Sequence, residues 1–216
     1  MKKIILLTGG SGMVGSNIIN HKYSLNYKIL SPTSSDLNLL NYQNIEDYIE
    51  SNNPEIVIHA AGTVGGIEAN MKYPVKFLFN NMQMGLNILM ASKTKKIKRF
   101  INLGSSCMYP KNAKNPIPED IILKGELEPT NEGYAIAKSA SARLCEYIAR
   151  EDNSFLYRTI IPCNLYGKYD NFSYDSSHMI PGVIRRIHDA KNDNSEFVDI
   201  WGDGLARREF MYAADL

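Results

Sequence analysis

The segment Lys3–Gly15, KIILLTGGSGMVG, joins a short apolar run to three glycines spaced three residues apart. Lys3–Thr8 predicts a buried strand, and Gly12–His21 predicts the start of a helix. Glycines between a strand and a helix permit a tight turn, close approach of a pyrophosphate and close packing of the helix on the strand. The phosphates then lie at the helix N-terminus, where free N–H groups and the helix dipole favour negative charge. A glycine motif alone is a weak signal, and a plain glycine-rich turn is the alternative.

Short apolar runs and helix-length segments alternate along the rest of the chain. This alternation favours the α/β class, with right-handed crossovers and a doubly wound parallel sheet of the Rossmann type. Residues 1–162 form the predicted dinucleotide-binding domain, and residues 163–216 form a smaller substrate-binding region. Residues 109–133 contain four prolines and predict a long functional loop. The expected strands are Tyr27–Ser31, Glu55–Ala60, Arg99–Gly104 and Ser154–Ile161, and the expected helices are Asn44–Ser51, Pro74–Thr94 and Tyr134–Arg150.

The composition argues against several other classes of protein. The 216 residues include 24 basic and 23 acidic ones, so the net charge of +1 gives no basic surplus for nucleic acid. No apolar run approaches the roughly 18 residues of a membrane-spanning helix, and the run near the start of the chain is too short for a signal peptide. Cys107, Cys145 and Cys163 show no paired spacing, which argues against a disulfide framework or a zinc site. We therefore expect a cytoplasmic, metal-free protein that binds neither nucleic acid nor membrane.

Tyr134 and Lys138 are four residues apart at the start of an expected helix, so their side chains share one helix face. An ammonium group beside a phenol favours the phenolate and lowers the pKa of the tyrosine, which can then exchange a proton with an oxygen near neutral pH. Ser105 and Ser106 follow the fourth expected strand, at the carboxyl edge where open α/β sheets bind ligands. Together these side chains predict reduction of a carbonyl group by hydride from a nicotinamide.

Seven segments of the chain carry a family resemblance: GMVGS (12–16), HAAGTVGGIEAN (59–70), LGSSCMYPK (103–111), LEPTNEGYAIAKSA (127–140), NLYGKYDNF (164–172), SHMIPGVIRR (177–186) and WGDGLARREF (201–210). With them the chain resembles the extended short-chain dehydrogenase/reductase family. Within that family it is similar to the GDP-L-fucose synthase group, which are NADPH-dependent GDP-4-keto-6-deoxy-sugar 3,5-epimerase/4-reductases. The resemblance covers nearly the whole chain, and it implies a GDP-sugar as the substrate.

The resemblance implies catalytic roles for five residues. Ser105 would orient the carbonyl group, Tyr134 would be the general acid, and Lys138 would assist Tyr134 and hold the nicotinamide ribose. Cys107 and His178 match the pair that moves protons at carbons 3 and 5 of the sugar. A thiolate base and an imidazolium acid can do this near neutral pH, because the 4-keto group acidifies the neighbouring C–H bonds. The alternatives are a buried small hydrophobe for Cys107 and a surface loop histidine for His178.

The resemblance also implies residues that contact the ligands. A planar guanidinium fork suits a diphosphate, and an indole suits stacking or packing. The implied GDP-sugar contacts are Asn164, Arg186, Trp201 and Arg208, with core packing as the alternative for Trp201 and a solvated helix face for Arg186. The implied dinucleotide contacts are Gly9, Ser11, Gly12, Met13, Val14, Gly15, Ser34, Ala60, Ala61, Gly62, Leu103, Lys138, Pro162, Asn164, Leu165 and His178.

The predicted cofactor is NADP, with NAD as the less favoured alternative. NAD specificity usually comes with an acidic residue at the end of the second strand, and Asp36 lies late for that role. In the resembled family the first turn commonly carries a His-Arg pair and the second strand ends with arginine, both for the 2′-phosphate. Gly10-Ser11 and Ser34 stand at those positions here, so this chain offers hydroxyl groups instead of guanidinium groups.

Four other functions stay open at this point. A relative that acts on a GDP-heptose can catalyse reduction alone, so the presence of Cys107 and His178 does not prove epimerisation. A 4,6-dehydratase would carry an acidic residue where Ser106-Cys107 stands, and a UDP-sugar 4-epimerase would carry a small residue or threonine in place of Cys107. A dinucleotide-binding regulator without turnover is the fourth, and the intact Ser105, Tyr134 and Lys138 set argues against it.

Two of the expected helices, 74–94 and 134–150, match the pair that forms a four-helix dimer bundle in the resembled family. A homodimer is therefore expected, and the alternative is that the apolar side chains of both helices pack on the sheet. Family members are also longer than this chain, so the substrate-binding region is expected to be incomplete. The apolar dimer surface would come from Met82, Leu86, Leu89, Leu144, Tyr147 and Ile148.

Overall fold

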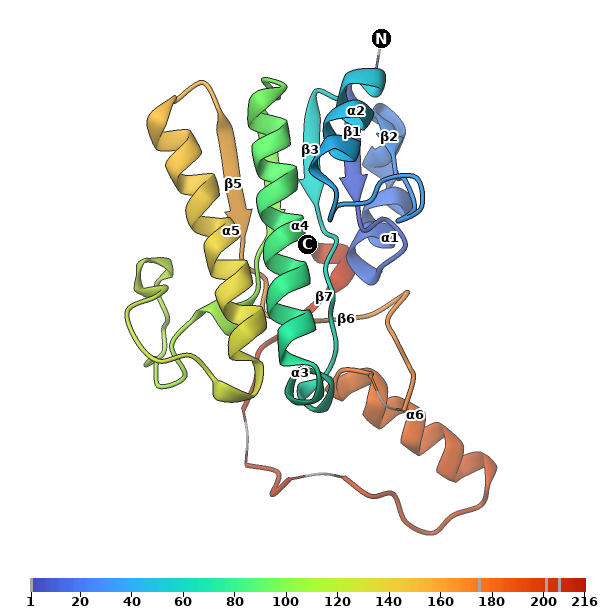
Figure 1. Cartoon of the computed structure of the whole chain (residues 1–216). Helices are drawn as coiled ribbons and strands as arrows, with labels where there is room; N and C mark the ends of the chain where they lie inside the picture. The colour runs from blue at the N-terminus through green and yellow to red at the C-terminus, as the bar shows by residue number, and fades with distance from the viewer. Residues whose placement is uncertain (1, 175, 201, 206) are drawn as a thin grey trace.

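The computed structural model describes residues 2–174, 176–200, 202–205 and 207–216. Its centre is a five-stranded sheet in the order β2-β1-β3-β4-β5, in which every neighbouring pair is parallel (Figure 1). The chain moves outward from β1 in both directions, which confirms the predicted doubly wound parallel sheet. The strands are β1 (Ile4–Thr8), β2 (Lys28–Leu30), β3 (Ile56–His59), β4 (Arg99–Leu103) and β5 (Leu156–Ile160).

Helices connect the strands and pack on one another. α4 contacts both α2 and α5, and Figure 1 shows α4 and α5 side by side in front of the sheet. Within the part of the chain that the structure describes, no helix is long and apolar enough to cross a bilayer. The α-helices are α1 (Met13–Asn20), α2 (Tyr42–Asn52), α3 (Ile67–Lys72), α4 (Pro74–Thr94), α5 (Glu132–Glu151) and α6 (Met179–Asn192). The 3₁₀ turns are η1 (Lys22–Asn26), η2 (Ser106–Met108), η3 (Glu119–Ile121), η4 (Pro129–Asn131) and η5 (Ala213–Asp215).

The hydrophobic core lies between the sheet and helices α2, α4 and α5. Leu6 and Phe100 enter it from the strands, and Ile88, Leu89 and Ile148 enter it from α4 and α5. Leu89 is fully buried and Ile148 is 1% exposed. The expectation that Leu89 and Ile148 face a second subunit is therefore wrong, because side chains that fill the core have no surface left to offer.

The chain after residue 162 leaves the main sheet. β6 (Asn164–Tyr166) pairs in parallel with β7 (Phe210–Tyr212) in a separate two-stranded sheet, and α6 lies between them in the sequence. Figure 1 shows α6 below the carboxyl ends of the main strands. The last turn, η5, returns to contact α1. The second region therefore lies at the end of the sheet where the glycine turn also lies.

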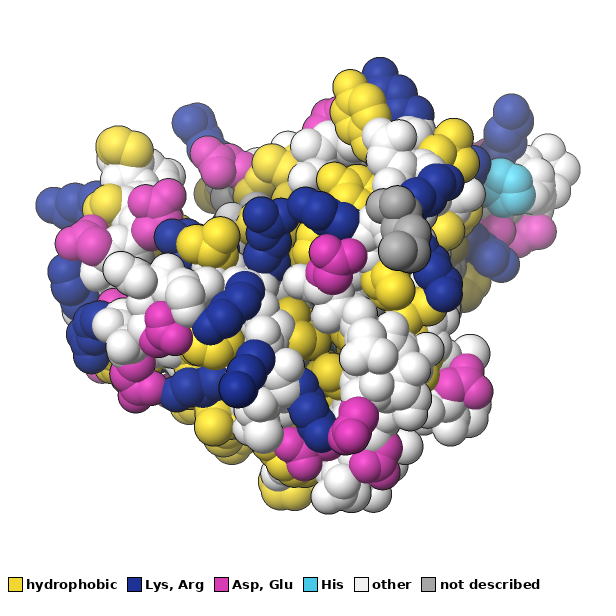
Figure 2. All heavy atoms as spheres, turned by 90° about the horizontal axis from the view of Figure 1, so that it is seen from above, with side chains coloured by type: hydrophobic (Ala, Val, Ile, Leu, Met, Phe, Trp, Pro, Cys, Tyr) yellow, Lys and Arg dark blue, Asp and Glu magenta, His cyan; other side chains and the backbone are white. Residues whose placement is uncertain are grey.

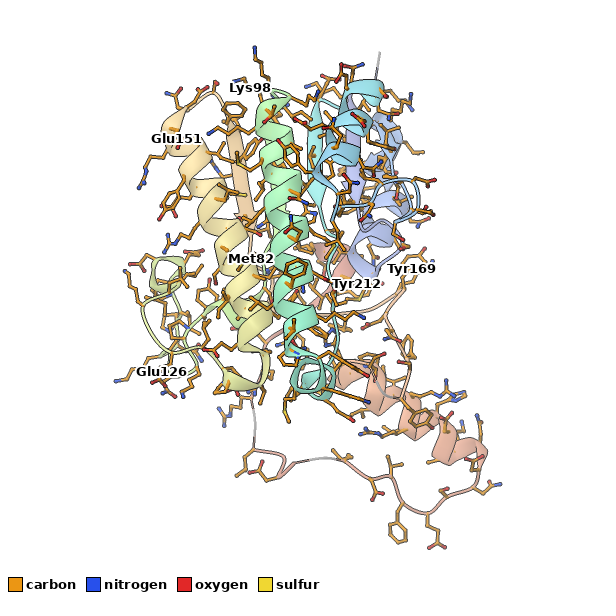
Figure 3. The ribbon with its side chains drawn as sticks, in the orientation of Figure 1. Met82, Lys98, Glu126, Glu151, Tyr169 and Tyr212 are labelled. Atoms are coloured by element: carbon orange, nitrogen blue, oxygen red, sulfur yellow. The ribbon has the colours of Figure 1, made fainter. Side chains whose placement is uncertain are left out.

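The opposite end of the sheet carries mixed charge. Figure 2 looks onto this end and shows Lys and Arg side chains interleaved with Asp and Glu. Ion pairs join Lys93 to Glu151 at 2.5 Å and Lys95 to Glu50 at 2.6 Å. Figure 3 places Lys98 and Glu151 at this same end. Exposed ion pairs contribute about 0–1 kcal/mol each, so this face adds little to the stability of the fold.

Some elements begin or end a few residues away from the expected positions. α1 begins at Met13 because Gly12 keeps an extended backbone, with φ −78° and ψ 172°. α5 begins at Glu132, two residues before the expected Tyr134, because the turn η4 leads into it. Residues 109–133 are not irregular throughout, since they contain η3 and η4, and the Lys111 N–H donates to the Glu126 carbonyl at 2.9 Å across the loop.

Candidate active site

The glycine turn after β1 is tightly packed against its neighbours. Gly9 has φ +77°, and a Cβ atom there would lie 2.5 Å from the backbone nitrogen of Ala61. A Cβ atom on Gly15 would lie 2.3 Å from the Gly9 carbonyl oxygen, so α1 can approach the turn only with glycine at that position. Gly12 caps α1 without a side chain. The positive end of the α1 dipole is therefore open to a phosphate, which fits the predicted dinucleotide site.

The hydroxyl-rich turn after β2 is closed on itself. Asp36 accepts hydrogen bonds from the Thr33 backbone N–H at 3.0 Å and the Thr33 hydroxyl at 2.7 Å. These bonds lower the pKa of Asp36, so its carboxylate is anionic and already engaged. Ser34 lies exposed within the turn. At the start of the glycine turn, a Cβ atom on Gly10 would lie 1.7 Å from the Ser31 hydroxyl oxygen, so the Ser31 side chain would have to rotate to admit a larger residue there.

The segment that follows β3 is fixed by a side chain that the sequence did not single out. Asn81 of α4 is buried, and its Oδ1 atom accepts the Thr63 N–H at 2.8 Å while its Nδ2 atom donates to the Thr63 carbonyl at 3.0 Å. These two hydrogen bonds to the Thr63 backbone hold Ala60–Gly62 beside the glycine turn. An asparagine within a helix is unusual, because its side chain competes for hydrogen bonds with backbone N–H and C=O groups. Asn81 in the middle of an expected helix was therefore the available sign of a special role.

Lys138 is buried at the carboxyl end of β4. Its Nζ atom donates to the Leu103 carbonyl oxygen at 2.8 Å and lies 5.7 Å from the centre of the Tyr134 ring. Burial lowers the pKa of Lys138 to about 8, against the opposing effect of Cys107. Burial also raises the pKa of Tyr134, so the expectation that Lys138 lowers it is wrong. The reason is geometric, since the ammonium group is directed at a carbonyl oxygen and the phenol is shielded from water.

Ser105 and Cys107 lie next to this pair. Ser105 caps the turn η2, and its hydroxyl accepts the Cys107 N–H at 3.4 Å. Burial raises the pKa of the Cys107 thiol, while a hydrogen bond with Ser105 and the charge of Lys138 act against that rise. The thiol and the two groups of α5 also affect one another electrostatically. The structure therefore brings Ser105, Cys107, Tyr134 and Lys138 together, and their catalytic roles stay a prediction.

A buried histidine joins two strand ends next to the site. His59 ends β3, and its Nδ1 atom lies 2.8 Å from the hydroxyl of Thr8, which ends β1. Burial lowers the pKa of His59 to about 3, and the charge of Lys138 adds to this effect. The ring is therefore neutral near pH 7 and acts as a hydrogen-bonding spacer between two strand ends. Neither Thr8 nor His59 was among the predicted site residues, although both follow apolar strand residues directly.

His178 belongs to a different element from the other four catalytic candidates. It caps the N-terminus of α6, is exposed, and accepts the Gly182 N–H at 3.0 Å through its carbonyl oxygen. Its segment lies near the loop after β3, because a Cβ atom on Gly66 would lie 3.4 Å from the Ser177 carbonyl oxygen. The histidine is thus at the correct end of the sheet, but the structure does not join it to Cys107 by a hydrogen bond.

The predicted sugar-nucleotide contacts are spread over the second region. Asn164 of β6 donates from Nδ2 to the Glu209 carbonyl at 3.0 Å, which ties β6 to the segment before β7. Arg186 is half-buried on α6, and Arg208 is exposed. Trp201 lies outside the described residues. Of the remaining predicted cofactor contacts, Pro162 is buried, Leu165 belongs to β6, Ser11 is exposed, and Met13 and Val14 form the first turn of α1.

A family model described as NAD dependent epimerase/dehydratase family matches residues 5–216. The chain belongs to this family. Among curated members of the NAD-dependent epimerase/dehydratase family, the GDP-L-colitose synthase of Yersinia pseudotuberculosis is 58% identical over 98% of this chain and 69% of that protein. The GDP-L-fucose synthase of Azorhizobium caulinodans is 50% identical over 99% of this chain and 68% of that protein.

Solved structures with the same fold are less similar in sequence and superpose closely on this chain. A GDP-L-fucose synthetase from Naegleria fowleri bound to NADP gives a TM-score of 0.87 at 30% identity, covering 99% of this chain and 70% of that one. A GDP-D-glycero-L-gluco-heptose synthase from Campylobacter jejuni, crystallised in the presence of NADPH, gives 0.88 at 25% identity, covering 99% and 71%. The chain thus spans about 70% of the length of these proteins.

The arrangement can bind a dinucleotide and move protons at an oxygen atom and at a thiol. The glycine turn offers helix N–H groups to phosphates, and Ser105 and Tyr134 offer hydroxyl groups beside one buried ammonium. Within the described residues no three His, Cys, Asp or Glu side chains come together as a metal-binding group.

Proposed function

We propose that this protein reduces the 4-keto group of a GDP-4-keto-6-deoxy-sugar with NADPH and epimerises the carbons beside that ketone. The observation that carries the proposal is the meeting of Ser105, Cys107, Tyr134 and Lys138 at the carboxyl end of β4. It occurs in a chain that is 58% and 50% identical to a GDP-L-colitose synthase and a GDP-L-fucose synthase.

The reduction follows from the protonation states of two residues. NADPH, when bound, would supply the hydride for carbon 4. Burial raises the pKa of Tyr134, so its hydroxyl keeps its proton at neutral pH and can give it to the sugar oxygen as that oxygen becomes negative. Lys138, with a pKa of about 8, is mostly charged at pH 7 and stabilises the phenolate that remains. The Ser105 hydroxyl donates to the same sugar oxygen and fixes the position of the ketone.

The epimerisation needs an acid and a base on opposite faces of the sugar. The base removes a proton from a carbon beside the ketone and leaves an enolate, and the acid returns a proton to the other face. We assign the first role to the Cys107 thiolate and the second to the His178 imidazolium, which end the step as thiol and neutral imidazole and exchange protons with water. Lys138 and the Ser105 hydrogen bond favour the thiolate against the effect of burial.

The residues present fit a dinucleotide cofactor. The turn at Gly9–Gly15 admits no Cβ at either end, and its helix N-terminus has no acidic residue in the first turn. Lys138 would hold the nicotinamide ribose. Ser11 and Ser34 are exposed at the adenosine end and would hold the 2′-phosphate through hydroxyl groups. The NADP-bound neighbour at a TM-score of 0.87 supports NADP as the cofactor.

A reductase that acts on a GDP-heptose without epimerisation is the second candidate. It is favoured by the match to a GDP-mannoheptose C4 reductase from Campylobacter jejuni, with a TM-score of 0.87 at 27% identity, and by the exposed position of His178. A 4,6-dehydratase or UDP-sugar 4-epimerase is disfavoured because Ser106-Cys107 stands where those enzymes carry other residues.

The deciding experiment is a turnover assay in deuterated water with NADPH. GDP-4-keto-6-deoxymannose, its 3-deoxy analogue and the corresponding heptose are offered separately, because L-colitose lacks the 3-hydroxyl group of L-fucose. NADPH loss with deuterium beside carbon 4 supports the epimerase/reductase, and NADPH loss without label supports a reductase alone. Failure to bind NADPH and to turn over any of the three sugars would contradict the proposal.

Three further properties belong to this proposal. The division into a dinucleotide-binding domain (1–162) and a substrate-binding region (163–216) is supported by the separate β6–β7 sheet. A homodimer is supported by an apolar stripe on α4, formed by Val75, Phe79, Met82, Leu86 and Met90, of which Val75 is 77% and Phe79 60% exposed. Figure 3 shows Met82 between α4 and α5. A cytoplasmic location is supported by three free cysteines.

A further inference from the structure

A buried asparagine on α4 holds the loop that follows β2. Asn87 is 7% exposed, and its Nδ2 atom donates to the carbonyl oxygen of Leu39, 48 residues earlier in the chain, at 3.0 Å. Asparagine is a poor helix former, and burying its amide is costly unless the amide is hydrogen-bonded. The bond to Leu39 satisfies the amide and ties the helix to a loop that is distant in the sequence.

The Asn87 amide is held in one orientation. Gln83, one turn earlier on α4, donates from Nε2 to the Asn87 Oδ1 atom at 2.8 Å. With its oxygen atom engaged by Gln83, the amide directs its N–H donors at Leu39. A side chain that is fixed by a second hydrogen bond can hold a loop in one position before any ligand binds.

The loop between β2 and α2 is anchored on its inner side and exposed on its outer side. Leu37 and Leu39 are buried in the core, whereas Ser34 and Ser35 are exposed. Residues 31–41 contain no lysine or arginine, so the polar groups that this loop can offer to a ligand are hydroxyl, amide and backbone groups and the carboxylate already engaged by Thr33. The position of the exposed hydroxyl groups therefore depends on the inner anchor.

This loop lies beside the glycine turn at the carboxyl edge of the sheet. β2 pairs in parallel with β1, so the segments that follow both strands leave the same edge. The two segments touch, because a Cβ atom on Gly10 would lie 3.0 Å from the Ser31 Cβ atom. In dinucleotide-binding sheets the residues after the second strand contact the adenosine ribose. The loop that Asn87 holds is therefore the one that would meet the adenosine end of NADPH.

A second asparagine of α4 holds the loop on the other side of the glycine turn. Asn81, six residues earlier on the helix, makes two hydrogen bonds to the Thr63 backbone in the segment after β3. β1 lies between β2 and β3 in the sheet, so the two held loops lie on either side of the glycine turn. One helix thus fixes both neighbours of the predicted phosphate site.

We propose that Asn87 is the positioning residue for recognition of the adenosine 2′-phosphate, acting through its hydrogen bond to Leu39. A guanidinium on a long stem can follow a phosphate, whereas a serine hydroxyl reaches only as far as its backbone places it. Recognition through Ser34 therefore needs a loop that is preorganised, and Asn87 supplies the preorganisation. The inference rests on the proposed NADPH site and does not depend on which sugar the protein reduces.

The first test is a binding measurement without sugar. Isothermal titration calorimetry with NADPH and with NADH compares the wild-type protein with Asn87→Leu, which keeps a similar volume and removes the donor. NADPH should bind about tenfold more weakly, and NADH, which lacks the 2′-phosphate, should lose less. Unchanged NADPH affinity, or equal losses for the two dinucleotides, overturns the inference.

Two further variants separate the hydrogen bond from general damage to the helix. Ser92→Ala is the matched control, since Ser92 is fully buried on α4 and its hydroxyl makes no hydrogen bond among the described residues. Its NADPH affinity should equal that of the wild-type protein, and an equal loss there contradicts a specific role for Asn87. Asn87→Ser shortens the side chain and removes the same bond, so it replaces Asn87→Leu if thermal melts show that the leucine variant is unfolded.

The second test separates cofactor binding from chemistry. In Asn87→Leu the KM for NADPH should rise about tenfold while kcat stays near the wild-type value, because Ser105, Tyr134 and Lys138 lie on other elements. A fall in kcat with an unchanged KM contradicts the positioning role. A wild-type protein that binds NADPH and reduces none of the sugars contradicts the proposed function, and the binding test still decides the role of Asn87.

Discussion

At the residue scale, the proposed reduction depends on the hydroxyl group of Tyr134. Tyr134→Phe removes the hydroxyl and keeps the ring, so the keto group loses its proton donor while the dinucleotide site is untouched. We expect NADPH oxidation to fall at least about 100-fold, with nearly unchanged NADPH affinity in a fluorescence titration. Retained reduction would remove Tyr134 from this role.

His59 makes stability depend on pH. Its pKa is lowered from 6.5 to about 3 in the folded protein. Between these two pH values the unfolded chain binds a proton on His59 and the folded chain does not. The contribution of neutral His59 to the free energy of unfolding is therefore complete above about pH 6.5. It is lost as the pH falls toward about 3, and the loss reaches about 4 kcal/mol. His59→Asn should flatten this slope in urea melts across the range. The exposed His21→Asn is the control and should keep the wild-type slope.

At the scale of elements, the packing of α1 on the glycine turn has a sharp test. In Gly15→Ala the new Cβ meets backbone at 2.3 Å, which cannot move cheaply, so the unfolding free energy should fall by about 2 kcal/mol. Gly12→Ala meets the Gly9 carbonyl only at 3.4 Å and should cost less than about 1 kcal/mol. Both are measured by thermal melts without cofactor, and equal losses would contradict the close approach of helix and turn.

Elements also show where sequence patterns were sufficient. Pro74–Thr94 is helical over the predicted span, because proline suits the first position of a helix and the buried residues recur every three or four positions along one face. β5 is shorter than expected, Leu156–Ile160 instead of Ser154–Ile161, because its ladder with β4 runs only from Arg99 to Leu103. Periodicity predicts that a strand exists, whereas pairing with its neighbour decides where it stops.

At the scale of the whole molecule, the apolar stripe on α4 predicts self-association. Phe79→Glu places a charge on a side chain that is 60% exposed, so a dimer built on this face should dissociate in sedimentation experiments while the monomer keeps its melting temperature. Tyr23→Glu, at a side chain 61% exposed on η1, is the matched control and should leave the sedimentation coefficient unchanged. A monomeric wild-type protein at micromolar concentration would contradict the proposed homodimer.

Apart from Cys107, which the family resemblance added, the amino-acid sequence by itself determined the class of fold, the glycine turn and the group of Ser105, Tyr134 and Lys138. These features are local, because each depends on residue type at a fixed spacing or at the end of a strand. Only the tertiary structure decided the direction of the Lys138 ammonium toward Leu103, the raised pKa of Tyr134 and the burial of Leu89 and Ile148. The physical reason is that the burial and electrostatic environment of a side chain are set by atoms distant in sequence. The spacing of residues along the chain cannot predict those contacts.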